Sequence, residues 1–331
     1  MSKYRRLCKI ALPLVLIWLI PEIYLYPMFL LYIKPTGEEK INEILSQVNR
    51  TNDTFEKLKM IVEWEVKDFT NAYNRRPDFF LDPFYRYPVY FDNGVKVRVL
   101  APVIPELSNN PYWTAFFKVG ACGELASLFN EVANRAGIKT RIVGTKGEDH
   151  SWVEVKINGE WIHADPTLYF LSYRYHLNIK WINNPRFYDL IWFNISKVFV
   201  KGSREDVTRR YTDTGTVIVH LTKPADRIVV KIIKNGKERE VTTIDVNSSV
   251  INIELGGKTY NITAEKDLIP NFIVLKETKR VLVIEGSTTK IDLSTQCPEF
   301  KPLFYVLVTV IVVFIFIWKY RGKWHEIRFL N

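Results

Sequence analysis

The hydrophobic positions change their spacing along the chain, and each spacing predicts a different kind of element. Between residues 38 and 73 they recur every three or four residues, which is typical of amphipathic helix. Asp53-Thr54-Phe55-Glu56, inside this region, resembles a capping box at a helix start. From 216 to 295 about seven short β-rich runs follow one another, with turn signals at Asn235-Gly236 and Gly256-Gly257. We therefore expect a helical region first and a small all-β sandwich over 216–296.

Two longer apolar runs lie outside these regions. Ile10–Ile33 has 24 residues with the single charge of Glu22, and Leu303–Trp318 has 16 residues with none. Their length and lack of charge predict a transmembrane anchor at 10–33 and a transmembrane helix at 303–318, with the lipid bilayer as a partner. A cleaved signal peptide is the alternative for the first run, but no small-residue cleavage site follows Ile20.

The charge of the chain agrees with a membrane protein and argues against a nucleic-acid partner. The formal net charge is +10, from 46 Lys and Arg against 36 Asp and Glu, and eight of these cations lie in the tails 1–9 and 319–331. Under the positive-inside rule both tails are cytoplasmic and the region between the two spans lies outside. Without the eight tail cations, Glu22 and Glu326, 38 cations face 34 anions, and this +4 is too small to indicate nucleic acid.

Three cysteines are too few for a disulfide scaffold or a four-cysteine zinc site. Cys122 lies far from both apolar runs, and it begins a predicted helix that ends near Gly137. A thiol in the first turn of a helix is stabilised as thiolate by free N–H groups and by the helix dipole. A disulfide between Cys122 and Cys297 is the alternative. The apolar face of this helix is formed by Leu125, Leu128, Phe129, Val132 and Ala133.

A β-hairpin is predicted shortly after this helix. Ser151–Ile157 alternates as a strand, Asn158-Gly159 is a two-residue turn, and Glu160–Asp165 returns. With such a turn, paired positions sum to 317, so that Glu154 opposes His163 and Trp152 opposes Asp165. One face of the hairpin is then apolar. The other face carries His150, Trp152, Glu154, Trp161, His163 and Asp165.

The second face of the hairpin places an imidazole beside a carboxylate. His150 lies diagonally opposite Asp165, within side-chain reach, and a thiolate at Cys122 would complete a nucleophile–base–orienter triad. His163 competes with His150 for the role of base, but its direct neighbour Glu154 indicates that this pair supports the site. A metal site formed by His150, His163 and Asp165 would leave Cys122 unexplained, so we expect neither a metal nor a cofactor.

The stretches that carry these residues resemble the core of the transglutaminase-like superfamily. GACGELASLFNEVANRAGIKTRIVG and DHSWVEVKINGEWIHADPT supply the cysteine, histidine and aspartate in that order. Within the superfamily the chain is most similar to the peptide:N-glycanase family, through Cys122-Gly123-Glu124, through Trp161–Pro166 and through Asp206–Tyr211. The resemblance implies an α+β, papain-like catalytic core over 38–212, ahead of the sandwich.

The same resemblance implies amide chemistry. Cys122 would attack an amide carbonyl, His150 would protonate the leaving amine, and Asp165 would orient His150. The oxyanion would be held by the Cys122 N–H and by the indole of Trp113. Trp152 and the aromatic residues of 74–111 would either stack on sugar or pack within the protein. The favoured substrate is the Asn–glycan amide of a glycoprotein, although the chain lacks the paired CxxC motifs of the zinc-bearing cytosolic enzymes. The alternatives are acyl transfer on other protein amides, hydrolysis of peptide or cell-wall amides, and a catalytically silent surface-binding protein.

Overall fold

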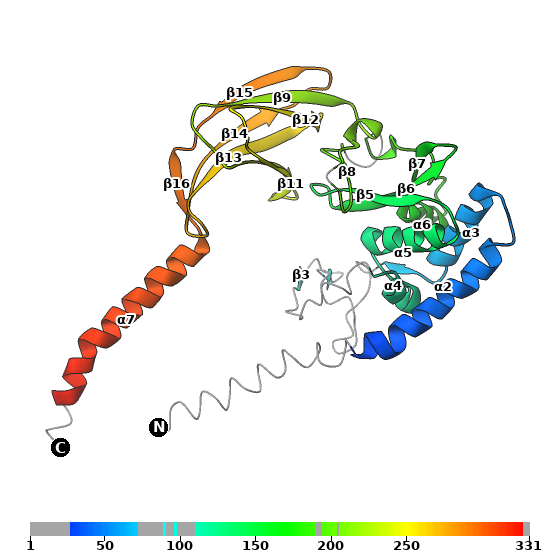
Figure 1. Ribbon diagram of the computed structural model, residues 1–331, viewed down its shortest axis with the longest axis horizontal. Coiled ribbons are helices and arrows are strands. Elements are labelled where there is room, and N and C mark those ends of the chain that lie inside the picture. Colours follow the sequence, from blue (N-terminus) through cyan, green and yellow to red (C-terminus); the bar gives the residue numbers. More distant parts are fainter. Residues whose placement is uncertain are drawn as a thin grey trace. The chain divides into compact units, whose positions relative to one another are not determined.

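The computed structural model describes residues 27–71, 89–90, 96–97, 110–189, 194–203 and 205–326, and side chains only to residue 316 in the last range (Figure 1). The chain divides into two compact units, and each is built from three segments that are separated in the sequence. The first unit comprises Met1–Gly144, His150–Pro185 and Phe199–Glu205; the second comprises Thr145–Asp149, Arg186–Val198 and Asp206–Asn331.

The described part of the first unit contains several helices and a four-stranded sheet in the order β7-β6-β5-β8. The helical segments are the π-helix η1 (Phe29–Ile33), α2 (Lys34–Val48), α3 (Thr54–Val66), α4 (Pro111–Phe117), α5 (Cys122–Arg135) and α6 (Pro166–Tyr175). The strands are β1 (Thr70–Asn71), β2 (Val89–Tyr90), β3 (Lys96–Val97), β4 (Val119–Gly120), β5 (Thr140–Thr145), β6 (His150–Ile157), β7 (Glu160–Ala164) and β8 (Phe199–Val200).

The helical region predicted over 38–73 consists of two helices, α2 and α3, separated by a short turn. The predicted capping residue Asp53 starts the second of them, because its carboxylate accepts hydrogen bonds from the backbone N–H groups of Phe55 and Glu56 at 2.7 and 3.0 Å. Capping satisfies two N–H groups that have no partner within the helix. The helix ends at Val66, earlier than the sequence pattern indicated.

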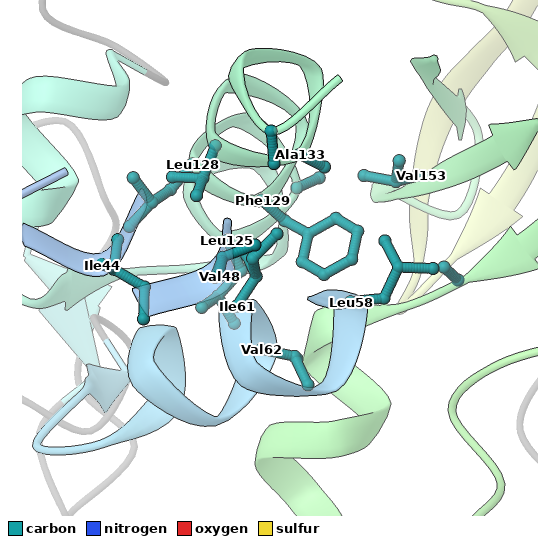
Figure 2. Packing of buried hydrophobic residues seen from close by; sticks show 14 of the residues in the cluster. Ile44, Val48, Leu58, Ile61, Val62, Leu125, Leu128, Phe129, Ala133 and Val153 are labelled. Carbon is teal, nitrogen blue, oxygen red and sulfur yellow. The ribbon is translucent and has the colours of Figure 1, made fainter. Parts of the chain in front are cut away.

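The core of the first unit lies between the helices and one face of the sheet (Figure 2). Helix α5 is at its centre, and its apolar residues fit among those of α2, α3 and the strand β6. All five predicted positions of the α5 face are buried. The labelled members of the cluster are Ile44, Val48, Leu58, Ile61, Val62, Leu125, Leu128, Phe129, Ala133 and Val153.

The predicted hairpin is present, and its register is confirmed. Glu154 pairs with His163, Val153 with Ala164 and Ile157 with Glu160, so each pair sums to 317. Val153 and Val155 have no exposed surface and pack into the core against α5. Successive side chains of a strand point to opposite faces of the sheet, so the residues that alternate with these two valines lie on the other face.

The second unit contains a β-sandwich, as the sequence predicted. Its two sheets have the orders β11-β10-β13-β14-β16 and β12-β9-β15, and side chains from both share one buried cluster. The strands are β9 (Thr214–Leu221), β10 (Arg227–Lys234), β11 (Lys237–Asp245), β12 (Val250–Gly256), β13 (Thr259–Ile269), β14 (Ile273–Leu282), β15 (Thr288–Leu293) and β16 (Cys297–Phe300). A short 3-10 helix, η5 (Thr208–Arg210), precedes them, and the helix α7 (Pro302–Glu326) follows.

One pair of predicted strands is a single strand in the structure. The sequence suggested separate strands at Phe272–Leu275 and Val281–Glu285, whereas β14 runs without a break through the polar residues between them. These polar residues pair with β13 throughout, and their side chains are largely exposed. The turn at Asn235-Gly236 is confirmed, with φ angles of +52° and +71°.

A buried carboxylate holds the segment Thr145–Asp149 in the second unit. Glu148 is 3% exposed, and its carboxylate accepts hydrogen bonds from the hydroxyls of Thr145 and Ser196. It also forms an ion pair with Lys258, with 2.7 Å between nitrogen and oxygen. The Lys234 ammonium binds the carbonyl oxygen of the same residue. The second unit therefore begins well before the predicted sandwich boundary at 216.

The prediction of two transmembrane helices, and with it the localisation with both tails in the cytoplasm and a catalytic region outside, is wrong. None of the helices that the structure describes is both long enough and apolar enough to cross a membrane. The uncharged run 303–318 lies in α7, where 16 residues extend for roughly 24 Å. That is shorter than the roughly 30 Å of a bilayer core.

The end of the first predicted span is part of the protein core. Phe29 and Ile33 are 6% and 1% exposed and belong to a buried cluster with Trp113 and Val119. Just after them, a Cβ on Gly37 would lie 2.3 Å from the carbonyl oxygen of Tyr112, so α2 and α4 approach each other closely at this glycine. Residues 10–26 lie outside the described residues.

Substitution of Lys258 tests how far the second unit depends on the buried Glu148. Lys258→Met leaves a buried carboxylate without its counter-charge, so we expect the unit to lose about 3 kcal/mol of stability. The control Lys231→Met removes the more exposed pair with Glu238 and should cost less than about 1 kcal/mol. Hydrogen exchange of amides in β10 and β13 reports on this unit alone. Equal losses in the two variants would contradict the account.

Candidate functional site

Cys122 is the first residue of α5, and its position is fixed by the residues before it. Ala121 is extended, with φ −122° and ψ −163°, and its N–H donates to the carboxylate of Glu124 at 3.0 Å. Gly120 leaves room for this contact, because a Cβ there would lie 2.4 Å from the Cβ of Glu124. Cys122 is half-buried, so its thiol is held at a defined helix start and remains reachable.

The segment that leads into Cys122 is anchored to α3. Strand β4 pairs in parallel with β1, and Lys118, just before it, has a left-handed backbone with φ +51°. The Lys118 ammonium donates to the carbonyl of Trp64 at 2.7 Å and lies 3.6 Å from the centre of its ring. Burial lowers the pKa of Lys118 to about 8, although the charge of Glu65 opposes this shift. These contacts restrict the backbone on the N-terminal side of the thiol.

His150 and Asp165 meet across the hairpin, as the sequence predicted from their diagonal positions. Nε2 of His150 lies 2.9 Å from Oδ2 of Asp165, and the two side chains are 6% and 0% exposed. The other oxygen, Oδ1, accepts the N–H of Thr167 at 2.7 Å and so caps α6. Asp165 is thereby fixed in place by a helix start, and the imidazole is fixed by Asp165.

The imidazole of His150 also hydrogen-bonds to the side chain of Cys122. Because Nε2 is engaged with Asp165, Nδ1 is the ring nitrogen left for the sulfur. Burial lowers the pKa of His150, but the negative charges of Asp165 and of a Cys122 thiolate outweigh it, together with the two hydrogen bonds, and raise the pKa to about 10. The arrangement favours a protonated imidazole next to the Cys122 side chain. The structure thus brings all three residues of the predicted triad together.

Trp152 supports the ring of His150. Their ring centres are 5.6 Å apart with an interplanar angle of 27°, and Trp152 has no exposed surface. This placement favours a role in holding the imidazole, because a fully covered indole offers no face to a sugar.

Trp113 is also buried, with its ring 6.0 Å from that of Phe29 and 5.0 Å from that of Phe117. Its role at the oxyanion stays a prediction.

His163 and Glu154 are cross-strand neighbours, but their side chains have different surroundings. Burial lowers the pKa of His163 to about 4, against the charge of Asp165, so this imidazole is neutral where His150 is charged. The carboxylate of Glu154 accepts from Nε of Arg141 at 2.6 Å. The contrast in pKa separates the two histidines and identifies His150 as the one able to donate a proton. Among the described residues, no group of possible ligands could hold a metal ion.

Two charged residues near the site, the partly buried Arg141 and the fully buried Glu65, were missed in the sequence. Arg141 links Glu154 to Glu205 and lies 4.2 Å from the ring centre of Trp161, contacts that depend on the neighbouring positions of β5 and β6. Glu65 has no exposed surface, and burial raises the pKa of its carboxyl well above the usual range, although the charge of Lys118 opposes this shift. A signal for Glu65 was available, because it follows Leu58, Ile61 and Val62 at helical spacing.

Other predicted features belong to the second unit or lie outside the described residues. Cys122 and Cys297 form no disulfide, so that alternative is excluded. Most of the aromatic segment 74–111 lies outside the described residues. In the stretch Asp206–Tyr211, Asp206 binds the ammonium of Lys197 at 2.5 Å and the hydroxyl of Thr208 at 2.5 Å, contacts that lie within the second unit.

The charge on Asp165 should control the protonation of His150. Asp165→Asn keeps an oxygen to cap α6 but loses the attraction, so the pKa of His150 should fall from about 10. Because the folded pKa is raised, the stabilisation from protonated His150 is complete below about 6.5 and is lost as the pH rises through about 10. NMR of the imidazole Cε1–H signals measures this. A wild-type His150 that titrates near 6.5 would contradict the account, and His163 serves as a neutral reference.

The cap at Ala121 should contribute to the stability of the first unit. Glu124→Ala leaves the Ala121 N–H without this acceptor and should cost about 1 kcal/mol. Glu124→Gln retains an amide oxygen at the same place and should cost clearly less. Urea unfolding of the two variants measures the difference. Equal destabilisation would indicate that the charge or packing of Glu124, rather than the cap, is what matters.

Comparison with known proteins agrees with the geometry of the site. Residues 85–166 match the family model described as the transglutaminase-like superfamily, and Cys122, His150 and Asp165 all lie within this match. No curated protein matches the chain. The matched region of the chain is thus similar to a superfamily whose members are commonly cysteine-dependent hydrolases and acyltransferases.

Proposed function

We propose that the protein catalyses acyl transfer at an amide carbonyl, with Cys122 as the nucleophile, His150 as the general acid and base, and Asp165 as the orienting carboxylate. The observation that carries this proposal is the position of His150, which is hydrogen-bonded to Asp165 on one side and to Cys122 on the other. This is the geometry by which a thiol is activated and a leaving amine is protonated.

The proposed reaction has two stages. The Cys122 thiolate forms a bond to the amide carbonyl carbon, and the C–N bond breaks as the imidazolium of His150 gives its proton to the departing nitrogen. A thioester remains on Cys122. His150, now neutral, then removes a proton from water or an amine, which attacks the thioester and releases the thiolate. The backbone N–H of Cys122, at the start of α5, is suited to stabilise the oxyanion.

Within this class we propose the Asn–glycan amide of glycoproteins as the favoured substrate. Two stretches that resemble the peptide:N-glycanase family support it, Cys122-Gly123-Glu124 and Trp161–Pro166. The first begins the helix of the nucleophile, and the second contains the orienting carboxylate. Asp206–Tyr211 adds little, since the contacts of Asp206 there stabilise the second unit. Other protein amides, with water or an amine as the acceptor, remain the alternative substrates for the same three residues.

The activated thiol can be tested against a second thiol of the same molecule. At about pH 6 an iodoacetamide-type probe should label Cys122 at least about tenfold faster than the exposed Cys297, because Cys122 lies in the first turn of a helix beside His150, whereas Cys297 lies in the strand β16. In His150→Ala this advantage should disappear, while labelling of Cys297 stays constant. Mass spectrometry of the two peptides gives both rates. Equal labelling of Cys122 in the wild type and in His150→Ala would contradict the proposal.

The substrate can be tested with a glycopeptide. We expect conversion of the glycosylated Asn to Asp, seen by mass, in the wild type and its loss in Cys122→Ala. If glycan is not released but an amine is incorporated into Gln, with the same dependence on Cys122, the acyl-transfer chemistry holds and the glycanase assignment fails. If the glycopeptide is not deglycosylated, no amine is incorporated into Gln and Cys122 does not react with the probe, the chain is a catalytically silent binding protein and the proposal fails as a whole.

A further inference from the structure

The second unit contains a pocket that the proposed catalytic chemistry does not use. Its volume is about 370 Å³, and it opens at the end of β10, beside the start of β13 and the strand β14. Every residue around it belongs to the second unit. The lining residues on which the argument rests are Glu148, Ile232, Ile233, Lys234, Lys258 and Arg280.

The pocket exists because two neighbouring strands separate. β10 pairs with β13 only as far as Lys231, which lies opposite Asn261. The pairing of β10 with β11 shifts register between Val230 and Lys231, and such a bulge bends a strand. Beyond this point the end of β10 no longer follows β13. The residues after the bulge and those at the start of β13 therefore line a hollow instead of continuing a ladder.

The lining of the pocket has an excess of positive charge. Lys234, Lys258 and Arg280 contribute three cations, and Glu148 contributes one anion, which gives a formal net charge of +2. Glu148 is already bound by two hydroxyls and by Lys258, so it fixes that lysine in place. Arg280 is exposed and forms no ion pair with any residue that the structure describes. Its guanidinium remains available for a ligand.

The surroundings of Lys234 would favour a bound anion. Burial lowers the pKa of Lys234, and the nearby cations Arg239 and Lys258 lower it further, while Asp149 and Glu148 act in the opposite direction. Like charges held together at a partly buried place repel one another, and a bound anion would relieve that repulsion. Ile232 and Ile233 supply an apolar wall beside these charges.

We propose that this pocket binds a small oxyanion carrying two or more negative charges, such as a phosphate, sulfate or carboxylate compound. The volume is within the range of pockets for small molecules. Arg280 can bind two oxygens of one such group in parallel, and the two lysines supply further charge-assisted hydrogen bonds. The hydroxyl of Thr259, also in the lining, is a neutral donor of the kind that commonly completes an oxyanion site.

Calorimetric titration of the full chain with inorganic pyrophosphate tests the proposal, at constant ionic strength so that general screening does not change. We expect one binding site in the wild type and about tenfold weaker binding in Arg280→Ala, because a charge-assisted contact is lost. The matched control is Lys279→Ala. Lys279 is also an exposed cation of β14, but strand parity places it on the opposite face from Arg280.

The control separates a defined site from general attraction to a basic protein. Binding that is weakened by Arg280→Ala and changed less than about twofold by Lys279→Ala supports the proposal. Equal weakening in both variants, or no saturable binding by the wild type, would overturn it. Arg280→Lys, which retains the charge and loses the paired donors, should bind with intermediate affinity. The catalytic proposal is tested separately, because Cys122, His150 and Asp165 belong to the first unit and every residue of the pocket belongs to the second.

Discussion

The candidate site depends on one buried imidazole held between the carboxylate of Asp165 and the side chain of Cys122. His150 would lose its proton if burial acted alone, and it keeps the proton because Asp165 and Cys122 lie on either side of the ring. Asp165 can do this because its second oxygen is committed to the start of α6. Trp152 covers the ring and restricts its rotation. The rest of the first unit can be understood as the support that keeps these groups in place.

Two simple features of the chain produce that support. The Asn158-Gly159 turn fixes the hairpin register, and the register decides that His150, Trp152 and Asp165 share one face. The start of α5 is fixed separately, by the cap on Ala121 and by the anchored residues before it. The two elements are joined through the apolar face of the sheet, where Val153 and Val155 pack against α5. Packing of a core therefore sets the distance between nucleophile and base.

Much of this site could be predicted from the sequence because its determinants are local. A two-residue turn sets the pairing, the period of a strand sets the faces, and the apolar positions after Cys122 set the helix. Features that depend on contacts between distant segments could not be predicted in the same way. The pairing of Glu154 with Arg141, for example, requires the order of the strands in the sheet, which the residue pattern within one strand does not give. The predicted spans were read from hydrophobicity alone, and residues such as Phe29 and Ile33 are apolar because they lie in a protein core.

The central claim is that Cys122 carries the acyl group during turnover, and it can be tested by locating that group directly. The protein would be mixed with an activated acyl ester, quenched in acid, digested and analysed by mass spectrometry. We predict that the acyl group is found on the Cys122 peptide, that it is absent in Cys122→Ala, and that it forms more slowly in His150→Ala. An acyl group distributed equally between Cys122 and Cys297, or unchanged ester turnover in Cys122→Ala, would contradict the account.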